Sequence, residues 1–253
     1  MNVKRAIVAL FCLFFPPSCL KNIVLRFFGF KLGKQCRIGF SFIHVADFCV
    51  GNSVVIGHGN YINVDSIKLK SDSKIGHLNM IFGPLIVFLD RCACVGNKNK
   101  IKRAKKPIVW GRAVFRLGIW SKITAGHLID CTRGVSIGDY SIIAGVGTQL
   151  WTHGYLHAPE GLERFRIDGS IRIGSNVYIG SACVINAGIK IANAVTVGSA
   201  SCVARSLDVA GLYVSQPLRC ISLDYEKASV RYPAVSALNL SERVVNKRVN
   251  TNL

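Results

Sequence analysis

Hydrophobic residues recur every six positions through the C-terminal part of the chain, and this period restricts the fold more than any other feature of the sequence. The recurring residues are Ile173, Ile179, Ile185, Ile191, Val197 and Val203. A Gly, Ala or Asn follows each of the first five of these residues. A period of six fits neither strand alternation nor the 3.6-residue helical turn. It is typical of a solenoid of triangular cross-section, in which each hexapeptide forms one flat side and its aliphatic residue points inward.

Weaker arrays of the same kind occur earlier in the chain. One array contains Ile38, Val50, Ile56 and Ile62, then shifts phase to Ile75 and Ile81. Another contains Ile123, Ile129 and Val135, then shifts phase to Ile137 and Ile143. Because parallel strands stack about 4.8 Å apart, we expect residues 34–223 to form one all-β, parallel β-helix. Two stretches break the period, and we expect an irregular insertion at 84–118 and a loop at 154–170, both at corners of the prism.

The N-terminal segment, residues 1–33, is apolar and basic. Its first fifteen residues resemble the start of a signal peptide, but Pro16 and Pro17 follow in place of a cleavage site, and the apolar run is too short to span a bilayer. Apolar residues then recur at helical spacing, with basic residues between them: Leu20, Ile23, Val24, Phe27 and Phe28. This pattern predicts an amphipathic helix that caps the core, lies on an anionic membrane, or does both. Residues 224–253 are expected to form a basic, weakly structured tail.

Charge and cysteine content restrict the partners and the compartment. The chain has 32 Lys and Arg against 13 Asp and Glu, a formal charge of +19. This surplus suits a nucleic acid, an acidic membrane face or a phosphate-rich cofactor. No motif interleaves aromatic and basic residues, so we do not expect nucleic-acid binding. The ten cysteines show no metal-ligand spacing, so we expect reduced thiols, no metal and a cytoplasmic protein, peripheral at the inner face of the membrane if the N-terminal helix binds lipid.

Several motifs resemble those of the hexapeptide-repeat acyltransferases. In order, these are Ile129-Asp130, Ile137-Gly138-Asp139, Thr152-His153, a loop, and the unbroken repeat from Ile173. They are most similar to the galactoside, maltose and nodulation-factor acetyltransferases and to the O-antigen and capsule O-acetyltransferases. The resemblance implies a left-handed β-helix, acetyl-CoA as acyl donor, a carbohydrate acceptor, and a homotrimer that binds the cofactor between neighbouring prisms.

His153 matches the family's catalytic histidine. A hydroxyl that attacks a thioester must lose its proton, and neutral imidazole accepts protons near pH 7. His157 is the rival candidate, but it lacks the Thr-His context. Asp130 matches an acidic residue that contacts acceptor hydroxyls. A carboxylate can also orient an imidazole or cap a turn, so these roles stay open.

The resemblance also implies a cofactor site along the C-terminal coils. The matching positions are Tyr178, Gly180, Ser181, Ser199, Ala204, Arg205 and Arg219. Arg205 replaces a family lysine, and both arginines suit the phosphates of CoA. The segment from Ser215 to Arg219 departs from the usual Gly-Asn-Pro-Ala-Lys.

Together these features predict an acetyl-CoA-dependent O-acetyltransferase that acts on a sugar hydroxyl in surface-polysaccharide biosynthesis, with His153 as general base. One alternative is N-acetylation of an amino sugar or nucleotide sugar. Another is a non-catalytic β-helix that serves as a scaffold.

Overall fold

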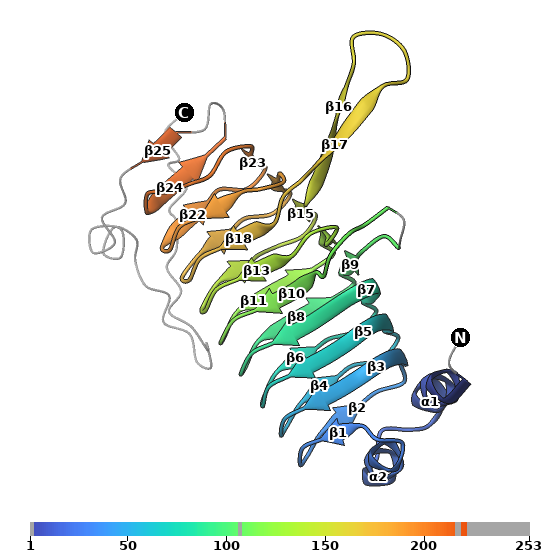
Figure 1. Cartoon of the computed structure of the whole chain (residues 1–253). Helices are drawn as coiled ribbons and strands as arrows, with labels where there is room; N and C mark the ends of the chain where they lie inside the picture. Colours follow the sequence, from blue (N-terminus) through green and yellow to red (C-terminus); the bar gives the residue numbers. More distant parts are fainter. Residues whose placement is uncertain (1–2, 106–107, 216–218, 222–253) are drawn as a thin grey trace, which may run out of the picture.

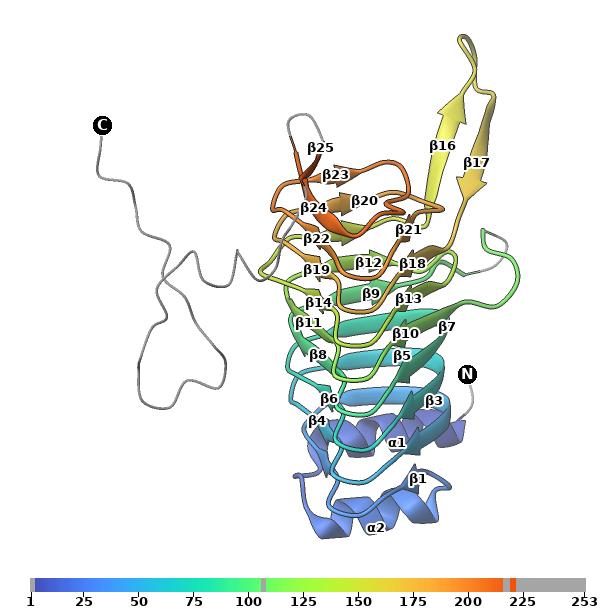
Figure 2. The ribbon, with the colours of Figure 1, turned by 90° about the vertical axis from the view of Figure 1, so that its left-hand side faces the viewer.

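The computed structural model describes residues 3–105 and 108–215, and the backbone of 219–221. The predicted tail at 224–253 lies outside these residues. The described chain forms the predicted left-handed parallel β-helix, with two helices at its N-terminal end and a hairpin that projects from its side (Figure 1). The side view shows the coils stacked along one axis (Figure 2).

Three flat sides make up the solenoid. The strands of the first side are β2 (Arg37–Ile38), β4 (Val55–Ile56), β6 (Lys74–Ile75), β8 (Cys94–Asn97), β11 (Lys122–Ala125), β14 (Ile142–Ile143), β19 (Tyr178–Ile179), β22 (Val195–Val197) and β24 (Gly211–Val214), with β25 (Arg219–Ile221) added antiparallel. The strands that run round a corner through both other sides are β3 (Phe42–Val50), β5 (Tyr61–Leu69) and β7 (Met80–Leu89).

Later coils divide these long strands into two separate sides. The second side continues with β9 (Lys100–Lys102), β12 (Leu128–Asp130), β15 (Gln149–Leu150), β20 (Val184–Ile185) and β23 (Cys202–Val203). The third side contains β1 (Lys31–Leu32), β10 (Val114–Leu117), β13 (Val135–Ile137), β18 (Ile171–Ile173) and β21 (Lys190–Ile191).

The six-residue period gives the core as predicted. All six aliphatic residues of the C-terminal repeat are buried, and Ile179 pairs in register with Ile143 below it and Val197 above it. Small residues are needed where coils meet at a corner. A Cβ on Gly180 would lie 2.7 Å from the backbone nitrogen of Ser199, so a larger side chain would push the coils apart.

A polar ladder runs along one corner inside the solenoid. The side chains of Asn60, Asn79, Asn99 and His127 each accept a hydrogen bond from a backbone N–H one coil further on, the last of them at Thr148. Burial lowers the pKa of His127. This histidine is therefore a neutral packing residue. It also follows the rule that a buried polar group has a hydrogen-bond partner.

Two short helices close the N-terminal end of the solenoid. Helix α1 (Val3–Phe14) and helix α2 (Cys19–Phe27) are separated by the two prolines, which cannot continue a helix. Val8, Cys12 and Leu25 are buried against the end of the core, so the end-cap interpretation is correct for this side of the helices. Neither helix of the described chain is long and apolar enough to cross a membrane.

Both predicted interruptions differ from expectation in detail. The irregular insertion expected at 84–118 is narrower, because β8, β9, β10 and much of β7 lie within it. The coil lengthens here from 18 to 20 residues between paired strands, as Arg37 pairs with Val55 but Lys74 pairs with Cys94. That change shifts the phase of the hydrophobic pattern without ending the solenoid. The longest stretch without a strand among the described residues of this insertion comprises 103–105 and 108–113, called the excursion below. The loop expected at 154–170 is mostly a hairpin of β16 (His153–His157) and β17 (Arg164–Asp168).

Candidate active site

His153 lies where the chain leaves the second side of the solenoid to enter the hairpin. Its side chain is 25% exposed, and its Nδ1 lies 2.9 Å from Oδ2 of Asp130, one coil below. A carboxylate only accepts hydrogen bonds, so this contact places the imidazole proton on Nδ1. In the neutral ring the other nitrogen, Nε2, then has a free lone pair. The arrangement can act as an oriented base.

Asp130 is buried at the end of β12 and is held by several donors. Its carboxylate accepts from the Thr152 hydroxyl at 2.7 Å and from the Thr132 hydroxyl and backbone N–H, both at 3.2 Å, besides His153. Burial alone would raise its pKa, but the hydrogen bonds from Thr152, His153 and Thr132 outweigh burial and hold the pKa below its usual value. The carboxylate therefore stays ionised and fixed. The sequence motifs predicted neither the contact of Thr132 nor that of the Thr152 hydroxyl.

Aromatic rings flank the histidine on both sides. The Trp151 and Tyr155 rings each lie 6.0 Å from the His153 ring, with their planes nearly perpendicular to it. Lys102 lies 5.5 Å over the Trp151 ring. The imidazole is thereby restricted in orientation by packing as well as by Asp130.

The excursion and the hairpin leave the solenoid at the same corner, one coil below and one coil above Asp130. They meet at the base of the hairpin, where the Trp110 indole N–H donates to Asp168 at 3.0 Å. Asp168 also accepts two hydrogen bonds from Arg166, at 2.6 and 2.9 Å. In the hairpin Asp168 pairs directly with His153, so their side chains are on the same face. The excursion therefore packs beside the catalytic candidate.

A basic cavity of about 430 Å³ opens at this meeting point. Its lining residues are Trp110, Arg133, Asp168, Gly169, Ser170, Arg172, Gly188, Ile189 and Lys190. The Arg133 guanidinium stacks 3.8 Å from the centre of the Trp110 ring. The lining holds three cationic side chains, Arg133, Arg172 and Lys190, and one carboxylate, which already accepts hydrogen bonds from Arg166. This surplus of positive charge favours a polar or anionic occupant.

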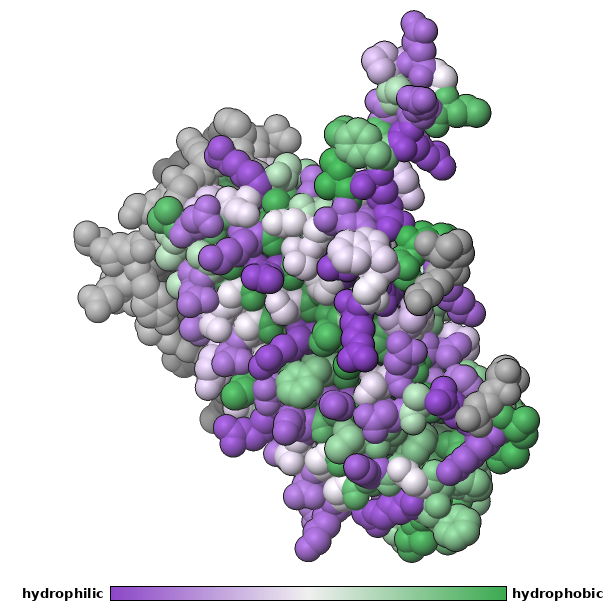
Figure 3. All heavy atoms as spheres, in the orientation of Figure 1, coloured by the Kyte–Doolittle hydropathy of each residue, from purple (hydrophilic) through white to green (hydrophobic). Residues whose placement is uncertain are grey.

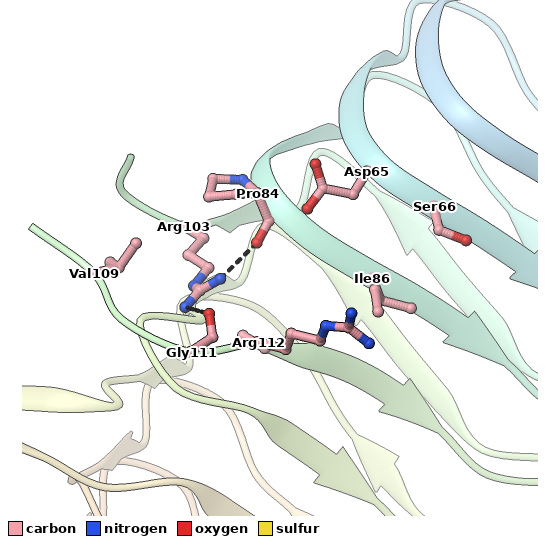
Figure 4. Close-up of a pocket in the computed structure, with 9 residues that line it drawn as sticks. Asp65, Ser66, Pro84, Ile86, Arg103, Val109, Gly111 and Arg112 are labelled. Atoms are coloured by element: carbon pink, nitrogen blue, oxygen red, sulfur yellow. Dashed lines mark hydrogen bonds between the residues drawn. The ribbon is translucent and has the colours of Figure 1, made fainter. Parts of the chain in front are cut away.

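A second cavity, of about 390 Å³, lies under the excursion and does not include His153 (Figure 4). Arg103 borders it but is buried, and it donates to the carbonyls of Pro84 at 2.7 Å, Trp110 at 2.9 Å and Gly111 at 3.0 Å. Its donors are used to hold the excursion in place, so Arg103 is a structural residue.

The predicted cofactor residues fall at the two edges of one sheet. Tyr178, Gly180, Ser181 and Ser199 lie at or before the corner where the first side turns into the second, and Ser181 N–H faces the Ser199 hydroxyl at 3.3 Å. Ala204 and Arg205 follow β23, at the corner that carries His153 two coils below. All except Gly180 and Ser181 are exposed. The Arg219 side chain lies outside the described residues.

Other predicted features are placed as follows. His157 is exposed on the hairpin, four residues from His153. Within the described ranges no group of three or more metal-ligating side chains comes together.

Neither a family model nor a curated protein matches the sequence. Solved structures of similar fold include a mutant of the N-acyltransferase AntD from Bacillus cereus in complex with dTDP and coenzyme A, with 20% identity, a TM-score of 0.42, and coverage of 62% of this chain and 86% of that one. A second is the polysialic acid O-acetyltransferase OatWY, with 15% identity, a TM-score of 0.48, and coverage of 79% and 90%.

A third is a hexapeptide-repeat acetyltransferase from Vibrio cholerae complexed with acetyl coenzyme A, with 16% identity, a TM-score of 0.39, and coverage of 87% and 85%. The solved neighbours are thus acyltransferases of the kind that the motifs resemble, and two of these three hold CoA or acetyl-CoA. These likenesses are too distant to assign an activity, which is argued from the residues around His153.

Proposed function

We propose that the chain is an acetyl-CoA-dependent O-acetyltransferase that acts on a sugar hydroxyl, with His153 as general base. The observation that supports this proposal is the hydrogen bond from His153 Nδ1 to a buried, ionised Asp130. It leaves Nε2 as a proton acceptor at the mouth of the site. A general base needs this fixed geometry before its basicity matters.

The reaction follows from that geometry. The acceptor hydroxyl attacks the thioester carbonyl while Nε2 of His153 takes its proton. The tetrahedral intermediate collapses, the C–S bond breaks, and the imidazolium returns the proton to the CoA thiolate. Asp130 stabilises the imidazolium and holds the ring, which is the orienting role among those predicted for it. Direct contact between Asp130 and the acceptor has less support, because its carboxylate already accepts from Thr132, Thr152 and His153.

The two substrates are proposed to occupy separate places. We propose that CoA lies along the second side, from the small residues Ser181 and Ser199 to Arg205, whose exposed guanidinium pairs with phosphate. In a homotrimer the neighbouring prism would form the other wall of this cleft. The basic cavity beside Asp168 is the candidate acceptor site, since its polar lining suits a hydroxylated or charged glycan.

We place the reaction in the cytoplasm, in the synthesis of a surface polysaccharide, at the inner face of the membrane. The positive charge and the exposed apolar residues of α2 (Leu20, Ile23 and Phe27) support a peripheral membrane contact.

The experiment that tests the proposed function compares purified His153→Ala with His157→Ala. We expect His153→Ala to bind acetyl-CoA like wild type but to lose roughly 10²- to 10⁴-fold in turnover, the range of positioned proton transfer. His157→Ala should lose little, because that ring is exposed on the hairpin.

Near-normal turnover by His153→Ala would remove the histidine from the mechanism. Paired acceptors that differ only in a hydroxyl or an amino group identify the acetylated atom. Exclusive transfer to the amine would replace O-acetylation by the N-acetylation alternative.

A further inference from the structure

Helices α1 and α2 have a second apolar face, opposite the one that caps the core. Seven large apolar side chains on it are between 51% and 87% exposed. They recur at helical spacing and are Val3, Ile7, Leu10 and Phe14 of α1 and Leu20, Ile23 and Phe27 of α2, together called the docking face. Apolar residues gather at this end of the molecule in the surface view (Figure 3). An exposed apolar patch of this kind marks an interaction site.

The two helices are held together as one preformed surface. The Lys21 side chain is buried, and its ammonium donates to the carbonyls of Cys12 at 2.7 Å and Phe15 at 2.9 Å, at the end of α1, and to Gly39 of the solenoid at 3.0 Å. The Ser18 hydroxyl caps α2 by accepting from the Lys21 backbone N–H. One lysine thus ties α1, α2 and the first coil, so the docking face needs no folding step on binding.

The charge around the docking face identifies its partner. The first 46 residues contain seven Lys and Arg and no Asp or Glu. Lys4, Arg26, Lys31 and Lys34 are exposed in or beside the helices. Asp47 is the acidic residue that lies beside this end, at a pocket that Lys4 and Arg5 also line. Apolar residues flanked by a surplus of cations match the chemistry of an anionic bilayer, where acyl chains receive the apolar residues and headgroups pair with the cations.

We propose that the docking face inserts into the surface of an anionic membrane, with both helices lying in its plane. A second copy of the chain fits this face less well. In a symmetric pair each copy would bring the same surplus of cations to the contact, and like charges across an interface are costly.

This orientation sets the height of His153, a step that rests on the proposed function. Five inter-strand steps separate β3, beside the helices, from β15, which precedes His153. At about 4.8 Å a step, the histidine is about 24 Å further along the solenoid axis than β3, and this is its added height above the membrane when the axis stands upright on it. The structure therefore points to an acceptor glycan that is anchored in the membrane and long enough to reach across these coils.

The test is cosedimentation of the full chain with vesicles of phosphatidylcholine alone or mixed with phosphatidylglycerol. We expect binding to the mixed vesicles that weakens with added salt. The double variant Ile7→Glu, Phe27→Glu should bind about tenfold more weakly or worse, because it removes apolar anchors and adds repulsion. Val209→Glu is the matched control, since Val209 is a similarly exposed apolar residue at the far end of the solenoid. Thermal melts check that all three proteins fold alike.

Equal recovery of wild type with and without acidic vesicles would overturn the proposal, as would undiminished binding by the double variant. A change in oligomer size caused by the double variant, measured by light scattering, would assign the docking face to another copy of the chain. Binding of acetyl-CoA and the loss of turnover in His153→Ala are measured without vesicles, so the proposed function fails or stands independently.

Discussion

Asp130 shows how the solenoid brings chemistry together at the scale of single residues. It is 23 residues from His153 in the sequence, which is one coil plus a few residues at the corner. The resemblance predicted both residues but not which of several roles Asp130 has. The buried hydrogen bonds from Thr132 and Thr152 favour the orienting role, because they already engage both carboxylate oxygens.

Asp130→Asn should reduce kcat while leaving the KM for acetyl-CoA nearly unchanged. The amide cannot stabilise an imidazolium, and it does not fix the proton on Nδ1. We expect a loss of about 10- to 10⁴-fold, the span seen for carboxylates that orient a functional histidine. Steady-state kinetics with each substrate varied in turn measures both constants. A large rise in the acceptor KM with unchanged kcat would instead favour direct acceptor contact.

The same carboxylate predicts how stability depends on pH. Its pKa is lower in the folded chain than in the unfolded one, so its contribution is complete above the unfolded value of about 3.9 and is lost as pH falls through the folded value. The Tm difference between wild type and Asp130→Asn should be constant near neutral pH and shrink below about pH 4. Melts of both proteins from pH 7 to pH 3 check this. A difference that grows on acidification would reverse the assigned direction.

At the scale of elements, the hexapeptide period predicted the coils, and it failed where the hydrophobic pattern changes phase. Lys74 and Cys94 pair although they are 20 residues apart. A strict six-residue period therefore assigns the wrong positions to the strands that follow. The hairpin could not be predicted for a different reason. Its apolar residues Tyr155, Leu156, Phe165 and Ile167 are exposed, so no buried face left a pattern in the sequence.

Ile185→Asp tests the interior assignment of the repeat. Ile185 is fully buried in β20, stacked on Leu150 and under Val203. A carboxylate there has no partner, and we expect a loss on the order of several kcal/mol in unfolding free energy. Asn186→Asp is the control, because the next side chain along the strand is exposed. Chemical denaturation of both variants gives the comparison, and equal midpoints would mean that the side chain does not point inward.

At the scale of the whole molecule, the solenoid separates the three sites proposed above. The docking face is at one end, His153 is five strand steps above β3, and Arg205 follows a strand two steps beyond β15. Parallel strand stacking is stiff, so these separations are fixed by the number of coils. The sequence contained this number in its repeats, but only the structure showed that the helices pack at the end of the axis with an apolar face left free.

This arrangement predicts a dependence on reach for membrane-borne acceptors. An acceptor sugar joined to a vesicle lipid by a short spacer should be acetylated poorly, and one whose spacer exceeds about 24 Å should be acetylated well, since that is the height of the coils below His153. A free acceptor of the same sugar should show no such threshold. The Ile7→Glu, Phe27→Glu variant should lose the preference for long spacers on vesicles while retaining activity on the free acceptor, because it no longer holds the solenoid at a fixed height. Acetyl transfer from labelled acetyl-CoA to a series of spacers measures the threshold. Equal rates for the shortest and longest spacers with wild type would show that His153 is not held away from the membrane.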